Sequence, residues 1–202
     1  MKIWHLDFEL DEFDNLIPVE ELSLDEIQSF NGSRKREVWK TIAVTKMEDK
    51  ELSNAPGFYS HIPVFDKITL EAVKDLIEDY AEVLPLACSE GEFYAINVVE
   101  VLNGIDYDKA QFKTFRDGKR IMRFEKYVFI KNAVDKKHIF KIIDEPLRKP
   151  FVSDELRQRV IDSKLKGFKF ELVWDSVLVI KLKSNWKTNK NVTAKLIWRY
   201  IL

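Results

Sequence analysis

The residues with the most chemical potential form a Glu-x-Lys triplet at 48–50, with Asp25 upstream. In metal-dependent nucleases such acids hold a divalent cation while the lysine assists the attacking water. That chemistry requires a strand that fixes all three side chains. The triplet instead lies in a polar stretch, 47–57, without flanking apolar strand residues, which favours a solvated loop. Asp106 and Asp108 could also hold a cation, but two acids in a loop are more typical of a turn.

The histidines and the cysteine lack the spacing of a catalytic or metal site. His5, His61 and His138 lie far apart, and none has a Cys or His at ligand spacing. On its predicted strand, His5 is expected to point outward beside Asp7. The single cysteine, Cys88, excludes an intramolecular disulfide, and its apolar neighbours predict a buried, unreactive thiol. Gly-x-Ser-x-Gly, Gly-Lys-Ser/Thr and Gly-x-Gly-x-x-Gly motifs do not occur in the sequence. We therefore predict neither an enzyme nor a metal or cofactor site.

Charge is unevenly distributed, although the net charge of the 202 residues is −1. From Ile3 to Ser33 there is no Lys or Arg. Charge complementarity speeds the association of proteins more than it tightens their complexes, so this stretch suits a basic partner protein. Nine acids are the predicted contacts: Asp7, Glu9, Asp11, Glu12, Asp14, Glu20, Glu21, Asp25 and Glu26.

The other end of the chain has the opposite charge, with no acid from Ser176 to Leu202. Its basic and aromatic residues could bind nucleic acid, with cations on phosphates and rings stacked on bases. Lysines are also typical of exposed edge strands, which is the favoured interpretation. A further alternative places the two termini side by side, where they neutralise each other. The basic and aromatic residues of this C-terminal stretch are Lys181, Lys183, Lys187, Lys190, Lys195, Arg199, Trp186, Trp198 and Tyr200.

Three helices are predicted from caps and apolar spacing. Ser23 begins a short helix with a capping box. Thr69 caps a longer one, whose apolar residues recur at three- and four-residue steps until Pro85 ends it. Ser153 caps a third helix, which Gly167 is placed to end.

Strands outnumber helices and do not alternate regularly with them, which predicts an α+β fold: a largely antiparallel sheet with two main helices packed on it. An Asp-Gly pair at 117–118 predicts a hairpin turn. We divide the chain into an acidic strand and helix segment at 1–57, a core domain at 58–175 and a basic tail at 176–202 within the same globule. The alternating residues of Lys2–Leu10 predict a half-buried strand. The other predicted strands are Val38–Val44, Phe93–Leu102, Arg120–Ile130, His138–Ile143, Phe168–Trp174 and Val177–Lys183.

The apolar start at Ile3-Trp4 is interrupted by His5 and Asp7, which is unlike a signal peptide. No apolar run approaches the roughly 18 residues that span a membrane. We therefore predict a cytosolic protein without a membrane partner, and the sequence makes no prediction about self-association.

Several segments occur in an order that resembles a known family. The most specific is a capped helix that leads into a Gly-Phe-x-Phe strand. In order, the segments are Glu82–Leu86, Phe93–Val99, Gly104–Asp106, Ile139–Lys141, Phe151–Leu156 and Leu165–Phe170. Over about 63–174 they resemble the immunity protein 11 family of bacterial polymorphic toxin systems, formerly a domain of unknown function.

This resemblance implies a cytosolic protein that binds and neutralises a cognate toxin. It implies no cofactor and no catalytic residue, and it assigns no binding position. The alternative from another class is a regulatory domain that binds a ligand or nucleic acid through the basic, aromatic C-terminal tail.

Overall fold

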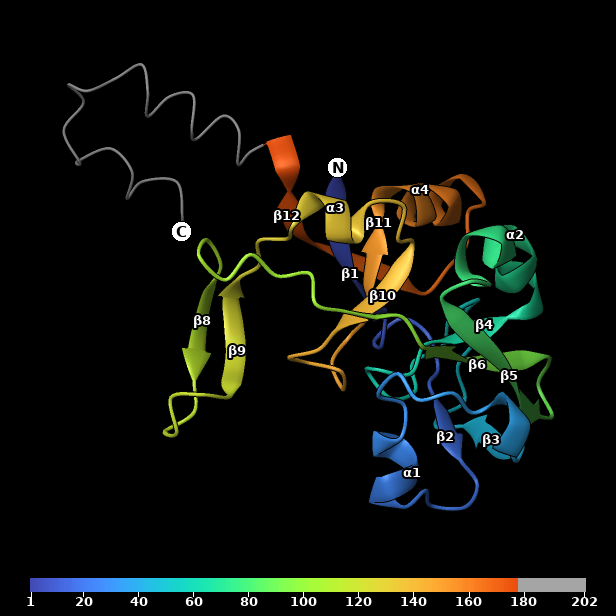
Figure 1. Ribbon diagram of the computed structural model, residues 1–202. Coiled ribbons are helices and arrows are strands. Elements are labelled where there is room, and N and C mark those ends of the chain that lie inside the picture. Colours follow the sequence, from blue (N-terminus) through green and yellow to red (C-terminus); the bar gives the residue numbers. More distant parts are fainter. Residues whose placement is uncertain (178–202) are drawn as a thin grey trace, which may run out of the picture.

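The computed structural model describes residues 1–177, which form two five-stranded sheets and a separate two-stranded hairpin (Figure 1). The basic tail and most of the strand predicted at 177–183 lie outside these residues. In spatial order, the first sheet contains β12 (Phe168–Asp175), β1 (Lys2–Phe8), β11 (Phe151–Ser153), β10 (Ile139–Ile142) and β7 (Val101–Leu102).

The second sheet and the hairpin contain the remaining strands. The hairpin consists of β8 (Gln111–Thr114) and β9 (Ile121–Lys126), and Gly118 in its turn has φ +66°, as the Asp-Gly pair predicts. In spatial order, the second sheet contains β2 (Leu16–Pro18), β3 (Ile42–Lys46), β5 (Ala81–Cys88), β6 (Phe93–Val98) and β4 (Val64–Asp66).

The predicted mixture of helices and strands is confirmed, but the strands form two sheets instead of one. Most neighbouring strands are antiparallel, as expected, whereas β7–β10 and β3–β5 are parallel pairs. The two main helices are α2 (Lys67–Ile77) and α4 (Asp154–Asp162), and the shorter ones are α1 (Leu24–Gln28), α3 (Lys131–Val134) and the 3-10 turn η1 (Arg36–Val38). The strand predicted from Val38 therefore begins four residues later, at Ile42.

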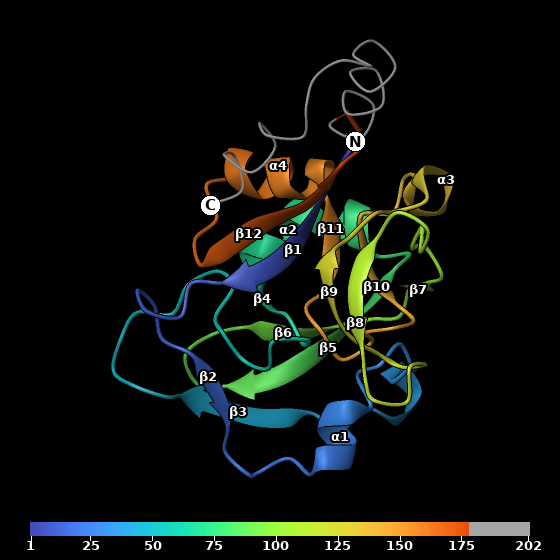
Figure 2. The same cartoon turned by 90° about the vertical axis from the view of Figure 1, so that its left-hand side faces the viewer.

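Strand β1 lies in the interior of its sheet, between β12 and β11, and is antiparallel to both (Figures 1 and 2). The prediction of a half-buried strand is wrong because both of its faces are covered. Leu6 and Phe8 pack into a core with α2 and α4, whereas Ile3 enters an aromatic core on the other side. The two ends of the described chain are thus joined by one strand pair, while the division into three segments stays a prediction.

Helix α2 begins and ends differently from the prediction. Its N-cap is Asp66, whose carboxylate accepts a hydrogen bond from the Thr69 backbone N–H at 2.7 Å. The helix ends at Ile77, and Leu84 lies in β5, paired with Ala95 of β6. A residue seven positions after Ile77 fits both a helical stripe and a new strand, so sequence spacing alone does not separate them.

Helix α4 has the predicted cap, since the Ser153 hydroxyl accepts from the Leu156 backbone N–H at 3.1 Å. Gly167 does not end this helix, which stops at Asp162. The glycine instead allows a close approach, because a Cβ there would lie 2.0 Å from Ser53 Oγ. Helices α4 and α2 lie on the same side of the first sheet (Figure 2). Arg159 of α4 donates to both carboxylate oxygens of Asp75.

The face of the first sheet away from these helices is covered by an aromatic core. Phe129, Phe140 and Phe151 contact one another there, and Trp174 contacts Phe129 with ring centroids 5.8 Å apart. The base of the hairpin joins this core, so the core determines where the hairpin stands.

Candidate partner-binding surfaces

Helix α1 positions the second half of the acidic segment. Its predicted capping box is confirmed: Ser23 Oγ accepts from the Glu26 N–H at 3.2 Å, and Glu26 Oε2 accepts from the Ser23 N–H at 2.8 Å. None of the five residues of α1, 24–28, is buried. The helix must therefore be held to the body by groups at its end.

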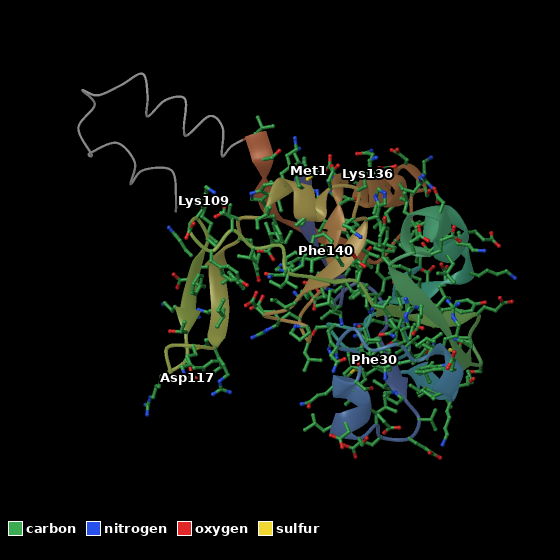
Figure 3. The ribbon with its side chains drawn as sticks, viewed as in Figure 1. Met1, Phe30, Lys109, Asp117, Lys136 and Phe140 are labelled. Atoms are coloured by element: carbon green, nitrogen blue, oxygen red, sulfur yellow. The ribbon has the colours of Figure 1, made fainter. Side chains whose placement is uncertain are left out.

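Two basic side chains from the body hold that end. His61 Nε2 lies 3.0 Å from the carbonyl oxygen of Ile27, and Lys141 donates from Nζ to the carbonyl oxygen of Phe30. The last carbonyls of a helix have no partner within it, so cationic and imidazole donors satisfy them. The side chain of Phe30, labelled in Figure 3, is itself buried. The acids near α1 are consequently presented on an anchored element.

The nine predicted acids occupy different environments. Glu26 belongs to the capping box, and Asp7 forms an ion pair with Lys149. Glu9 and Asp7 are half-buried. The other exposed acids form no side-chain hydrogen bond or ion pair within residues 1–177. These five are Asp11 and Glu12 before β2, and Glu20, Glu21 and Asp25 after it.

Asp14 is the exception, since it is only 2% exposed and thus unavailable to a partner. Its carboxylate accepts from the backbone N–H groups of Asn15, Glu48 and Lys50 at 2.8, 2.9 and 3.0 Å. Burial alone would raise the pKa of Asp14, but these three donors outweigh it and lower the pKa. Asp14 therefore holds the 47–50 loop in place.

Replacing Asp14 by asparagine should lower the free energy of unfolding by about 1–2 kcal/mol, because the amide loses the charge and one of the two accepting oxygens. Urea denaturation at pH 7 measures this. Asp11→Asn removes the same charge from an exposed neighbour and should change stability by less than about 0.5 kcal/mol. Equal effects of the two substitutions would contradict a structural role for Asp14.

The Glu-x-Lys triplet lies in this same loop, as predicted. Lys46 pairs with Asp49 at 3.1 Å and Lys50 with Glu48 at 2.8 Å, while Asp25 lies on α1. Across residues 1–177, the structure brings no three His, Cys, Asp or Glu side chains together as a metal site. Cys88 is half-buried in β5, so the prediction of a buried thiol is wrong.

The β8–β9 hairpin carries a second charged surface, which the sequence analysis missed. Between 109 and 126 there are seven basic residues and two acids, a net charge of +5. All nine charged residues are exposed. Figure 3 labels Lys109, which precedes the hairpin, and Asp117, which lies at its turn. The density of basic residues around the Asp-Gly turn was the available signal. The basic residues are Lys109, Lys113, Arg116, Lys119, Arg120, Arg123 and Lys126.

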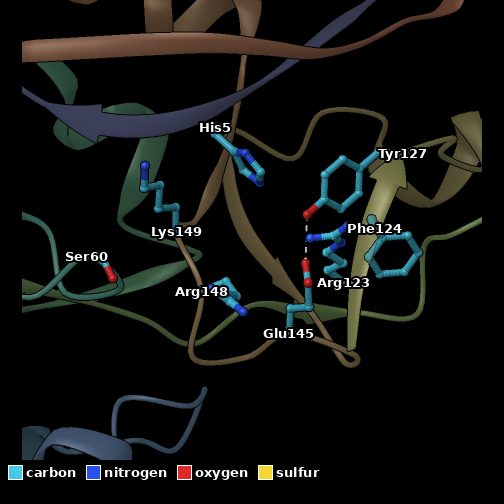
Figure 4. A pocket seen from close by; sticks show the side chains of 8 residues that line it. All are labelled: His5, Ser60, Arg123, Phe124, Tyr127, Glu145, Arg148 and Lys149. Carbon is cyan, nitrogen blue, oxygen red and sulfur yellow. Dashed lines mark hydrogen bonds between the residues drawn. The ribbon is translucent and has the colours of Figure 1, made fainter. Parts of the chain in front are cut away.

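A cleft of about 450 Å³ lies between the hairpin and the body (Figure 4). Hydrophobic, cationic and hydrogen-bonding groups are mixed in its walls. Tyr127 donates from its hydroxyl to Glu145 at 2.7 Å, so one carboxylate oxygen of this acid is occupied. The lining residues are His5, Ser60, Arg123, Phe124, Tyr127, Glu145, Arg148 and Lys149.

Burial determines the charge of the aromatic groups in this cleft. Mainly because of burial, the pKa of His5 is lowered from 6.5 to about 4, so its ring is neutral at pH 7. The prediction that His5 points outward beside Asp7 is therefore wrong: its ring lies 4.5 Å from that of Phe151 and 5.3 Å from that of Tyr127. Burial first, and then the hydrogen bond to Glu145, raise the pKa of Tyr127.

These features define the class of the protein. It is a mixed α/β protein with two exposed, oppositely charged surfaces. Residues 87–175 match the Immunity protein family (Imm11), which confirms the resemblance over that segment. The matching segment includes the hairpin and the loop with Arg148, but none of the nine predicted acids. No curated protein matches the chain.

None of the helices within residues 1–177 is long and apolar enough to cross a membrane.

Proposed function

We propose that this protein is an immunity protein that binds a cognate toxin of a polymorphic toxin system in the cytosol and thereby neutralises it. The observation that carries this proposal is the match of residues 87–175 to the immunity protein family. Neutralisation occurs by occlusion of the toxin, without a bond made or broken by this chain.

The contact that we propose consists of the exposed acids on either side of β2. Asp11 and Glu12 precede this strand, and Glu20, Glu21 and Asp25 follow it. Asp14 anchors the neighbouring loop, and His61 and Lys141 anchor α1, so the acids are held with little conformational freedom. Preorganised charge of one sign suits a basic toxin surface and accelerates association with it.

Co-expression with a candidate toxin, such as the product of a neighbouring gene, tests neutralisation. Cells that produce both proteins should grow, whereas cells that produce the toxin alone should not. Failure of the wild-type protein to protect the cells would overturn the proposed function.

Reversal of exposed acids tests the proposed contact separately. Glu12→Lys, Glu20→Lys and Glu21→Lys combined should lower the association rate constant for the toxin by about tenfold or more and weaken its salt dependence. These positions leave Asp14 and the capping box intact. Surface plasmon resonance at several salt concentrations measures the rate.

The matched control places the same change of charge near α2, with Glu71→Lys, Glu78→Lys and Asp79→Lys; all three acids are exposed. This variant should retain most of the association rate. If both triple variants associate equally fast, the acidic contact is wrong, although neutralisation through another surface would stand.

A further inference from the structure

The β8–β9 hairpin is incomplete as a structural unit. Within residues 1–177 its two strands pair only with each other, so each has an edge of unpaired backbone groups. Two-stranded hairpins are at best marginally stable in water, and exposed strand edges are sites where an extended segment can add. The hairpin also stands away from both sheets (Figure 1).

Packing stabilises only the base of the hairpin. Phe124 of β9 stacks on Tyr127 with centroids 4.9 Å apart, and Phe112 of β8 contacts Phe124 at 5.7 Å. Nearer the turn, Phe115 is 45% exposed and Met122 is 41% exposed. The outer half thus offers apolar surface, unpaired backbone and positive charge together.

The cleft beneath the hairpin adds two cations from different elements. Arg123 comes from β9 and its only ion pair within residues 1–177 is with exposed Glu125, at 3.5 Å. Arg148 comes from the loop after β10 and makes no side-chain hydrogen bond or ion pair within the described chain. Beside them, the buried Nε2 atom of His5 has no hydrogen-bond partner among those residues. These groups face the same space in Figure 4.

We propose that the hairpin and this cleft form a docking site for an acidic, extended segment of a partner protein. The segment lies along the basic hairpin and places a carboxylate between Arg123 and Arg148, where guanidinium groups bind carboxylates by two parallel hydrogen bonds. Phe124 and Tyr127 provide the apolar wall of the same cleft. This proposal does not depend on toxin binding by the acidic residues around β2.

The positive charge of the hairpin favours an acidic segment as the occupant of this site. Seven basic residues against two acids attract a polyanion, and the two acids are engaged with Arg120 at 2.7 Å and Lys113 at 2.9 Å. The segment 178–202 of this chain is unsuitable because it contains only basic charged residues. A backbone edge together with an apolar wall favours a polypeptide over a nucleic acid.

Fluorescence anisotropy with a labelled octaglutamate peptide and the full chain tests the site. The double variant Arg123→Gln, Arg148→Gln should weaken peptide binding by about tenfold or more, because it removes both bidentate partners. The matched control, Arg116→Gln with Lys119→Gln near the turn, removes the same charge and should weaken binding by less than about threefold. Circular dichroism should show that both variants are folded.

Two probes distinguish other occupants. A labelled single-stranded DNA octamer should bind more weakly than the peptide. Tighter binding of the DNA, with loss in the Arg123/Arg148 variant, would assign the cleft to nucleic acid. Sedimentation of the unliganded wild type and of this variant should show the same oligomeric state. Self-association of the wild type that the variant abolishes would assign the cleft to the acids of a second copy.

Three results overturn the proposal directly. They are the absence of peptide binding to the wild-type chain, equal weakening by the two double variants, and greater weakening by the variant near the turn.

Discussion

A polypeptide of residues 87–175, the segment that matches the immunity protein family, is expected to remain unfolded on its own. It contains the edge strand β12 but lacks β1, the strand with which β12 pairs along its whole length. It also contains α4 without α2, to which α4 is bound through Arg159 and Asp75. Each remaining layer therefore exposes a surface that the missing elements cover.

The burial free energy that the fragment lacks is comparable with the entire stability of a domain. Ile3, Leu6 and Phe8 of β1 are at most 4% exposed. Burial of such side chains contributes about 1.5–3 kcal/mol each, so these three account for roughly 5–9 kcal/mol. Domains are stable by only about 5–15 kcal/mol in total.

Circular dichroism and two-dimensional NMR measure the outcome, with the full chain as the control. The fragment should give a poorly dispersed spectrum, and addition of a second polypeptide of residues 1–86 should restore dispersion. A well-dispersed spectrum from the fragment alone would show that 87–175 is an independent domain.

Replacing Lys141 by methionine is expected to raise the free energy of unfolding by about 2–3 kcal/mol at pH 7. Lys141 is 1% exposed, and burial lowers its pKa from 10.5 to about 8. A charged group with a depressed pKa destabilises the folded state wherever the lysine is protonated in both states. The difference between the two pKa values, about 8 and 10.5, corresponds to a penalty of about 3 kcal/mol for the charged group. The hydrogen bond to Phe30 offsets about 1 kcal/mol of this penalty.

The two pKa values of Lys141 also determine how the stability of the wild-type protein changes with pH. Below pH 8 the lysine is protonated both folded and unfolded, and the full penalty applies. Between pH 8 and 10.5 the unfolded chain binds more protons than the folded one, so wild-type stability rises with pH. The advantage of Lys141→Met should therefore shrink through this window.

Urea denaturation of both proteins at intervals from pH 7 to pH 10.5 measures the difference in their free energies of unfolding. The contributions of the other titrating groups are the same in both proteins and cancel in this difference. Lys136→Met, at an exposed position, is the control and should leave stability nearly unchanged. A Lys141→Met variant that is less stable than the wild type at pH 7 would show that the ammonium group stabilises α1 more than burial destabilises the core.

The arrangement of Lys141 also bears on recognition. A buried ammonium group is costly, yet its hydrogen bond to the carbonyl of Phe30 helps to anchor the segment that carries Glu20, Glu21 and Asp25. We expect Lys141→Met to slow association with a basic partner, even though the variant itself is more stable, because the segment after α1 would lose the hydrogen bond that Lys141 donates to Phe30.

Features that depend on a few consecutive residues followed from the sequence. The caps at Ser23 and Ser153 and the turn at 117–118 are local, because each hydrogen bond joins residues two or three positions apart. The mixture of helices and strands followed from apolar spacing in the same way. The surplus of acids before Ser33 is likewise visible without a structure.

Only the tertiary structure decided which of these residues are free to act. Asp14 differs from Asp11 because two of its three donors come from residues more than thirty positions away. Leu84 is in a strand because β6 pairs with it, and His5 is neutral because aromatic rings from 127 and 151 surround it. Burial and strand pairing join residues that are distant in the chain, and local spacing contains no information about which distant residues will meet.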